Sequence, residues 1–119
     1  MRVGFIRLHE DAKIPQKAYE TDSGFDLHAI ETVKIRPGGT AVIPTGIAVV
    51  LPEGHEAQVR PRSGITSKTK IRVQLGTIDN GYCGEIGIIV DNIATHDWET
   101  IEKGQRIAQL VVQDRKSVV

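Results

Sequence analysis

Short hydrophobic runs rich in Val and Ile alternate with turn-forming residues along this chain of 119 residues. β-Branched residues favour extended backbone, so these runs predict β-strands. One segment, residues 64–68, is the only candidate for a helix, and that helix is short. The predicted strands cover residues 3–8, 32–36, 46–51, 55–60, 85–90 and 107–112.

Proline and glycine separate the predicted strands at regular intervals. Short strands with such punctuation are typical of an antiparallel all-β barrel or sandwich. The chain is long enough for one hydrophobic core and too short for two, so we expect residues 1–119 to form a single domain. The turn signals are Pro37-Gly38-Gly39, Pro44-Thr45-Gly46, Pro52-Glu53-Gly54 and Lys103-Gly104.

Charge and composition exclude several classes of partner. Lys plus Arg and Asp plus Glu both number 15, so no net field attracts nucleic acid or an anionic membrane surface. Aromatic residues make up 4% of the chain, too few for a groove that stacks single-stranded nucleic acid. We therefore expect neither nucleic acid nor a membrane as a partner.

The cysteine and histidine residues limit the cellular compartments and the kinds of catalytic site that we expect. The lone Cys83 cannot form an internal disulfide, and we see neither a charged-then-apolar leader nor a long apolar run, which favours a cytoplasmic protein. No Walker-type phosphate-binding loop occurs, which removes the commonest class of nucleotide triphosphatase. The histidines lack the spacing of a zinc site; they are His9, His28, His55 and His96.

The most informative segment is residues 76–86, which places an acidic side chain and an aromatic ring on a tight turn between apolar runs. Asn80-Gly81 predicts a two-residue β-hairpin with a type I′ turn, because both residues tolerate positive φ. Asp79 and Tyr82 on such a turn can face one ligand. The alternative is an ordinary surface hairpin whose polar residues serve only the turn.

A second segment, residues 60–64, is suited to an anion. Arg62 offers a planar fork of donors that matches phosphate oxygens, and Ser63 adds a hydroxyl. Gly64 allows a ligand to approach the backbone closely. A polar turn after a strand explains the same residues without a ligand.

Together with two further segments, these residues resemble the trimeric dUTPase family, the deoxyuridine triphosphate nucleotidohydrolases. The resemblance covers residues 14–112, nearly the whole chain. It rests on Ser23-Gly24-Phe25-Asp26-Leu27, Pro61-Arg62-Ser63-Gly64, residues 76–86 and Gly104-Gln105-Arg106-Ile107-Ala108-Gln109-Leu110.

Three departures from the family pattern stand out. Cys83 occupies a position where the family usually has arginine, and Gln105 one where it usually has aspartate. The family's glycine-rich C-terminal arm has no counterpart before Ser117-Val118-Val119, where the sequence ends.

The resemblance implies a jelly-roll-like β barrel or sandwich that assembles as a homotrimer. It also implies that water attacks the α-phosphate of dUTP and releases dUMP and pyrophosphate, with Mg²⁺ carried mainly by the substrate phosphates. We therefore assign no protein ligand to the metal. Each site would lie between subunits, because the family combines the third motif of one chain with the second and fourth motifs of a neighbour.

The resemblance also implies roles for individual residues. Asp79 would activate the water as a general base, and Tyr82 would pack on the deoxyribose and reject a 2′-hydroxyl. The backbone around Gly76 and Ile78 would read uracil. The remaining substrate-binding residues are Arg62, Ser63, Gly64 and Gln109 at the phosphates, with Asp26 in support behind the site.

Two other functions stay open at this point. A binding or regulatory module of the same fold with weak or no turnover fits the missing arm. An enzyme related to dCTP deaminase would share the fold, although the uninterrupted Thr77-Ile78-Asp79-Asn80-Gly81-Tyr82 favours uridine hydrolysis.

Overall fold

The computed structural model describes residues 2–16 and 24–114, which form eleven β-strands and one short helix. Ser23 of the first motif and the last residues, Ser117-Val118-Val119, lie outside the described residues. The elements are β1 (Gly4–Arg7), β2 (Gly24–His28), β3 (Val33–Ile35), β4 (Thr40–Pro44), β5 (Ile47–Val50), β6 (His55–Pro61), α1 (Ser63–Lys68), β7 (Ile71–Val73), β8 (Gly76–Ile78), β9 (Gly87–Asn92), β10 (Glu99–Ile101) and β11 (Arg106–Asp114).

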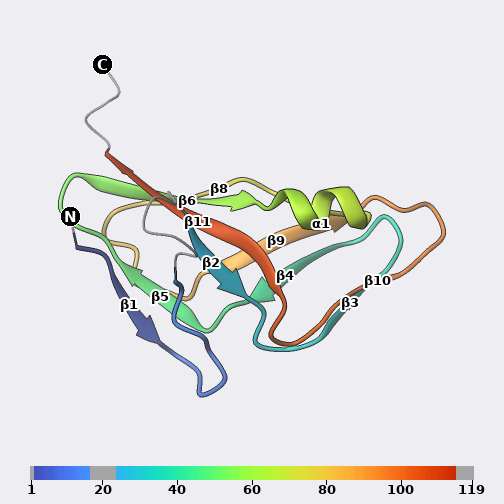
Figure 1. Ribbon diagram of the computed structural model, residues 1–119, viewed down its shortest axis with the longest axis horizontal. Coiled ribbons are helices and arrows are strands. Elements are labelled where there is room, and N and C mark those ends of the chain that lie inside the picture. The colour runs from blue at the N-terminus through green and yellow to red at the C-terminus, as the bar shows by residue number, and fades with distance from the viewer. Residues whose placement is uncertain (1, 17–23, 115–119) are drawn as a thin grey trace.

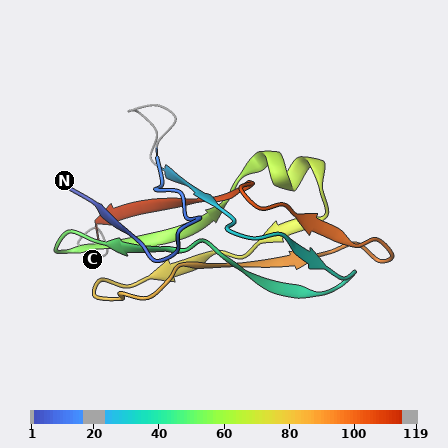
Figure 2. The ribbon, with the colours of Figure 1, turned by 90° about the horizontal axis from the view of Figure 1, so that it is seen from below.

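The strands pair antiparallel throughout the described residues, in four small sheets. The largest has the order β2-β11-β6-β8 and the next the order β4-β9-β7, while β1 pairs with β5 and β10 with β3. Figure 1 shows β6 and β11 side by side, with α1 at one end of β6. Seen from below, β6 and β11 lie in one layer, with α1 on its outer side, and β4 and β9 lie in the other (Figure 2). The prediction of an all-β fold is confirmed.

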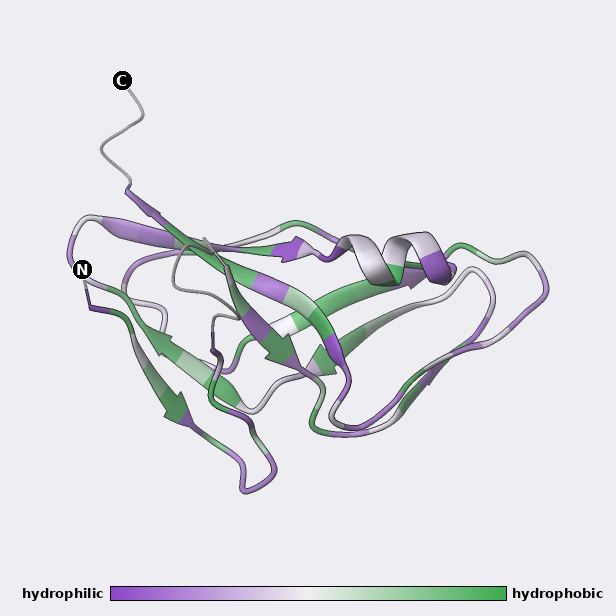
Figure 3. Ribbon diagram, in the orientation of Figure 1, coloured by the Kyte–Doolittle hydropathy of each residue, from purple (hydrophilic) through white to green (hydrophobic). Residues whose placement is uncertain are grey.

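The hydrophobic core lies between these two layers because alternate residues of strands such as β9 point inward. The larger sheet contributes Leu27, Val59 and Leu110, which are almost fully buried. The facing sheet contributes Ile43 and Ile88 in the same way. Figure 3 shows hydrophobic residues along β4, β5 and β9 and hydrophilic ones in most of the connecting turns, as this packing requires.

The sequence located the predicted strands and the helix to within about two residues, and the structure adds β2, β4, β7, β8 and β10. The turn glycines are also as expected. Gly38, Gly46, Gly54 and Gly104 all have positive φ, between 68° and 85°, which side chains other than glycine rarely adopt.

The predicted hairpin at Asn80-Gly81 is wrong. β8 pairs with β6, and β9 pairs with β4 and β7, so the two strands that flank the turn belong to different sheets. Only Gly81 has positive φ, at 96°, whereas a type I′ turn needs it at both central residues. The Tyr82 N–H donates to the Asp79 carbonyl at 3.1 Å, and this geometry is that of a type II turn.

His28 on β2 makes the stability of the fold depend on pH. Its Nδ1 atom is buried with no hydrogen-bond partner among the described residues. Burial first, and then the positive charge of Lys13, lower the pKa of His28 from its ordinary value of 6.5. Below that value the unfolded chain binds more protons than the folded chain, so acid favours unfolding.

We therefore expect the free energy of unfolding to fall as the pH drops below about 6.5, and His28→Gln to reduce this fall. Urea denaturation at a series of pH values measures the free energy of unfolding of both proteins. His96→Gln, on an exposed loop, is the matched control. Equal pH dependence in wild type and His28→Gln would contradict the assignment.

No helix within residues 2–16 and 24–114 is long and apolar enough to cross a membrane.

Candidate functional site

A cavity of about 280 Å³ opens beside the turn that follows β8. Its size is near the lower end of the range for ligand pockets, about 300 to 1,000 Å³, and suits a nucleoside. Four of the residues that the sequence predicted to act at the site line it: Gly76, Ile78, Asp79 and Tyr82. The rest of the lining is Val59, Thr77, Glu85, Ile86, Gly87 and Ile89.

The turn that carries Asp79 and Tyr82 is tied down by Asn80. The Asn80 side-chain amide donates to the carbonyl oxygens of Pro52 and His55, both at 2.9 Å. This anchors the turn to the loop between β5 and β6. Asp79 and Tyr82 are exposed beside it, with Tyr82 50% exposed, so both side chains can meet a ligand in the cavity.

The edge of β8 supplies backbone groups to the same cavity. Among the residues that the structure describes, β8 is the last strand of its sheet and pairs only with β6, so the backbone N–H and C=O groups on its other edge are not used by this sheet. An open edge of this kind can bind any flat molecule that presents complementary donors and acceptors. Gly76 and Ile78 lie on this strand.

A second group of predicted residues gathers where β6 runs into α1. Arg62 precedes the helix, and Ser63 and Gly64 form its first turn, where backbone N–H groups have no partner within the helix. Arg62 forms an ion pair with Asp26 of β2. The other carboxylate oxygen of Asp26 accepts from Arg106 at 3.2 Å. Asp26 therefore holds two cationic side chains in place.

Gln109 of β11 belongs to this second group. It lies opposite Asp26 in the strand pairing, and its side-chain amide donates to the Pro61 carbonyl at 3.2 Å. Gly24 leaves the space that the Gln109 side chain fills. A Cβ atom on Gly24 would lie 3.2 Å from the Gln109 Cβ and would overlap its Oε1 atom.

We expect Gly24→Ala to push the Gln109 amide away from the Pro61 carbonyl, with a small loss of stability. The atom that the new Cβ overlaps is at the end of a flexible side chain, so the strand itself can stay in place. The NMR signal of the Gln109 side-chain amide and the thermal midpoint, measured on the same preparation, test this. Gly4→Ala is the control, because its Cβ would make an ordinary 3.4 Å contact. An unshifted Gln109 amide signal in Gly24→Ala would show that the position of Gln109 does not depend on this space.

The two groups lie at opposite ends of β6. Ile78, next to Asp79, pairs with Ala57, whereas Arg62 follows Pro61 at the far end of the strand. At about 3.3 Å per residue, the stretch from Ala57 to Pro61 alone spans roughly 13 Å. The structure therefore brings together the cavity residues, and separately the residues near Arg62, but not the two groups within one chain.

Sequence reasoning did not single out Arg106, Asn80 or Glu85 for a role at the site. Arg106 lies inside the fourth motif, but its partner Asp26 is 80 residues away in the chain, so no local signal reveals the contact. The sequence predicts Asn80 as a turn residue, and its contacts to the preceding loop are also non-local. The Glu85 carboxylate accepts from the Gly46 N–H at 3.1 Å, and these residues are 39 positions apart in the chain.

The fold and the cavity define a small all-β protein with a nucleoside-sized site. Comparisons with known proteins identify one family. A family model described as dUTPase matches residues 10–118. A deoxyuridine 5'-triphosphate nucleotidohydrolase of Clostridium tetani is 50% identical over 108 residues, which cover 89% of this chain and 74% of that protein. One of Picosynechococcus sp. is 47% identical over 114 residues, covering 94% and 80%.

Solved structures agree. A mutant dUTPase from phage phi11 of S. aureus, described for its coordination of a structural Mg(II) ion, has a TM-score of 0.91 at 32% identity, covering 96% of this chain and 91% of that one. The dUTPase of Staphylococcus bacteriophage 80alpha with dUPNHPP has a TM-score of 0.89 at 32% identity, covering 95% and 82%. The chain belongs to the dUTPase family.

Proposed function

We propose that this chain is a dUTP diphosphatase, which hydrolyses dUTP to dUMP and pyrophosphate. One observation carries this function. Asp79 and Tyr82 both line a nucleoside-sized cavity, and the sequence is 50% identical over 108 residues to a deoxyuridine 5'-triphosphate nucleotidohydrolase. Nothing in the described residues favours a second function more strongly.

Asp79 is the general base of the reaction. It accepts a proton from a water, whose oxygen forms a bond to the α-phosphorus while the bond from the α-phosphorus to the bridging oxygen breaks and pyrophosphate leaves. Its exposure at the cavity mouth supports this role, because a base must reach the water it activates. Its position on an anchored turn keeps the carboxylate in place.

The nucleoside is read by the cavity. The open edge of β8, with Gly76 and Ile78, pairs with uracil and leaves no space for the methyl group of thymine. The ring of Tyr82 packs on the deoxyribose, where an added 2′-hydroxyl collides. A half-exposed aromatic ring in the cavity lining supports this assignment, because one of its faces is available to a sugar.

The triphosphate is bound by the second group of residues. Arg62 and Ser63 contact the phosphates, Gly64 offers its backbone N–H, and Gln109 donates near the α-phosphate. Asp26 positions Arg62 rather than touching the nucleotide, because both of its oxygens already face arginine side chains. Negative charge that develops on the phosphate oxygens is thus met by fixed donors.

Mg²⁺ would be bound chiefly through the substrate phosphates, with no protein ligand assigned to it. The donor set fits this arrangement: residues 2–16 and 24–114 contain no group of three or more His, Cys, Asp or Glu side chains that could hold a metal ion. Mg²⁺ prefers phosphates and water over an all-protein cage. Its chemistry, when bound, is to neutralise charge on the phosphate oxygens.

The chain functions as a homotrimer with sites shared between subunits. The span of β6 supports this, since a base beside Ala57 cannot reach a phosphate held at Ser63 of the same chain. Exposed apolar residues next to the cavity also support it, because such surface is usually covered by another molecule. They are Val42, Leu75 and Ile89, exposed by 62%, 64% and 41%.

We place the protein in the cytoplasm and treat residues 1–119 as one domain. A free, exposed Cys83 suits a reducing compartment. One cluster of buried residues, to which both main sheets contribute, suits a single domain.

Pyrophosphate release from dUTP in the presence of Mg²⁺ tests the function, with UTP, dTTP and dCTP assayed in parallel. Turnover confined to dUTP is the expected result. Tight binding of dUTP without turnover would favour a regulatory module, and ammonia release from dCTP would favour a deaminase. Either result would overturn the proposal.

A further inference from the structure

The orientation of Tyr82 is set by contacts with the residues that follow it in the chain. Its hydroxyl donates to the backbone carbonyl of Glu85 at 2.9 Å, so the ring lies back across Gly84. A Cβ atom on Gly84 would lie 2.5 Å from the Tyr82 hydroxyl oxygen and 2.7 Å from the ring carbon that carries it. The ring can therefore take this position only because residue 84 has no side chain.

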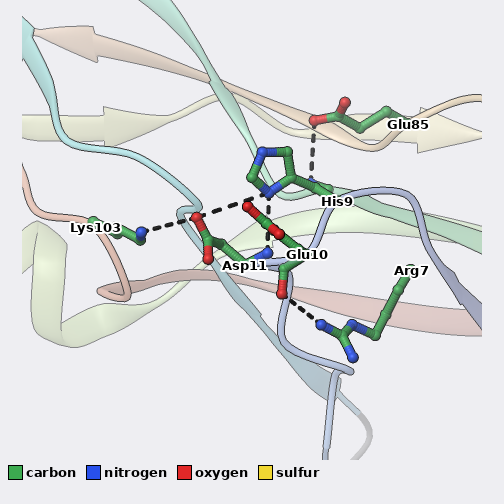
Figure 4. Close-up of polar contacts among 7 residues, drawn as sticks. Arg7, His9, Glu10, Asp11, Glu85 and Lys103 are labelled. Atoms are coloured by element: carbon green, nitrogen blue, oxygen red, sulfur yellow. Dashed lines mark hydrogen bonds and ion pairs between the residues drawn. The ribbon is translucent and has the colours of Figure 1, made fainter.

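Glu85 is fixed in turn by the connection between β4 and β5. Its carboxylate accepts from the Gly46 N–H at 3.1 Å (Figure 4). Gly46 is closely packed, since its carbonyl accepts from the Leu8 N–H at 2.7 Å and a Cβ on it would meet Ala12 at 2.9 Å and His9 at 3.0 Å. The loop before Ala12 is held by the ion pair of Asp11 with Lys103, at 2.9 Å (Figure 4).

The next residue, Ile86, is held by the same connection. The Thr45 hydroxyl, on a side chain that is 1% exposed, donates to the Ile86 carbonyl at 2.6 Å. The Ile86 N–H donates to the Ile47 carbonyl at 2.8 Å. Ile86 thus has two backbone anchors, and its N–H also orients the peptide group that carries the Glu85 carbonyl, while the Glu85 carboxylate adds a side-chain contact.

We propose that Glu85 is a positioning residue for Tyr82 and, through that ring, for the selection of deoxyribose over ribose. Between the anchored Asn80 and the anchored Ile86, Gly84 allows the backbone wide freedom. The Glu85 carbonyl shares a planar peptide group with the anchored Ile86 N–H, and the contact of the Glu85 carboxylate with Gly46 restrains the same residue on the side that joins Gly84. The inference rests on the role of Tyr82 in the proposed function.

The test is the ratio of kcat/KM for dUTP to kcat/KM for UTP in Glu85→Ala. We expect the ratio to fall about tenfold, the effect of losing one charge-assisted hydrogen bond. Glu85→Gln keeps an oxygen that accepts from Gly46 and should restore most of the ratio. Because Glu85 is exposed, the thermal midpoint should change little. A ratio that stays at the wild-type value in Glu85→Ala, or Glu85→Gln as impaired as Glu85→Ala, would overturn the proposal.

A double-mutant cycle with Tyr82→Phe gives a second test. Glu85→Ala and Tyr82→Phe both release the same ring. The change in the logarithm of the ratio in the double variant should therefore be smaller than the sum of the changes in the two single variants. Independent, additive effects would count against the inference.

Equilibrium binding of dUMP and UMP repeats the comparison without turnover. If wild type fails to hydrolyse dUTP, the proposed function is lost, yet the effect of Glu85→Ala on the two affinities still decides the positioning role. If wild type is active and the affinity ratio is the same in Glu85→Ala, only the positioning role is lost.

Discussion

Asp79→Asn is expected to fold normally and to lose about 100- to 10,000-fold of its dUTP turnover, the usual contribution of a general base. Asparagine suits the same turn position, and the hydrogen bond from the Tyr82 N–H uses the backbone carbonyl of residue 79, which the change leaves intact. The amide oxygen can still contact water but cannot accept a proton. Pyrophosphate release at saturating dUTP, beside thermal unfolding, measures both properties.

Asp97→Asn, on the exposed loop after β9, is the matched control and should behave as wild type. Affinity for dUTP should change far less than turnover in Asp79→Asn, because the base contributes mainly in the transition state. If Asp79→Asn turned over dUTP at the wild-type rate, Asp79 would have no part in the reaction.

Two inactive variants, Asp79→Asn and Ser63→Ala, should regain activity when they are refolded together. In a trimer with shared sites, a chain with intact Asp79 can face a chain with intact Ser63. About three quarters of randomly mixed trimers contain both variants, and one of the three sites in each is then intact, so about a quarter of wild-type activity should return. Activity is measured before and after mixing.

The control pairs Asp79→Asn with Tyr82→Ala. These residues lie on one turn of one chain, so no site in a mixed trimer has both, and activity should stay low. If Asp79→Asn and Ser63→Ala together remained as inactive as they are separately, although sedimentation showed mixed trimers, the shared-site arrangement would be wrong.

Local features of the sequence predicted much of the fold. The turn glycines, such as Gly46 and Gly54, could be predicted because positive φ is a property of a single residue. Strands with several adjacent β-branched residues, such as β9, could be predicted because these residues favour extended backbone wherever they occur. Strands such as β8, with three residues that include a glycine, have too little pattern for a prediction.

Pairing across the sheets could not be predicted from local pattern. Asn80-Gly81 gave a hairpin signal, but Ile78 finds its partner in Ala57 of β6, 21 positions earlier. The same limit applies to the site. The residue types at Asp79 and Arg62 led to a prediction for the site, whereas the contacts of Asp26 with Arg106 and of Glu85 with Gly46 depend on the folded chain and have no local signal.

β6 is hydrogen-bonded on both sides, to β11 along its whole length and to β8 over residues 57–59. A one-residue insertion or deletion in this strand would turn every later side chain to the opposite face and break the register with both neighbours. Length changes in natural or designed descendants of this chain should therefore accumulate in loops such as residues 93–98. The interval from Ala57 to Arg62 should stay constant even where its side chains diverge.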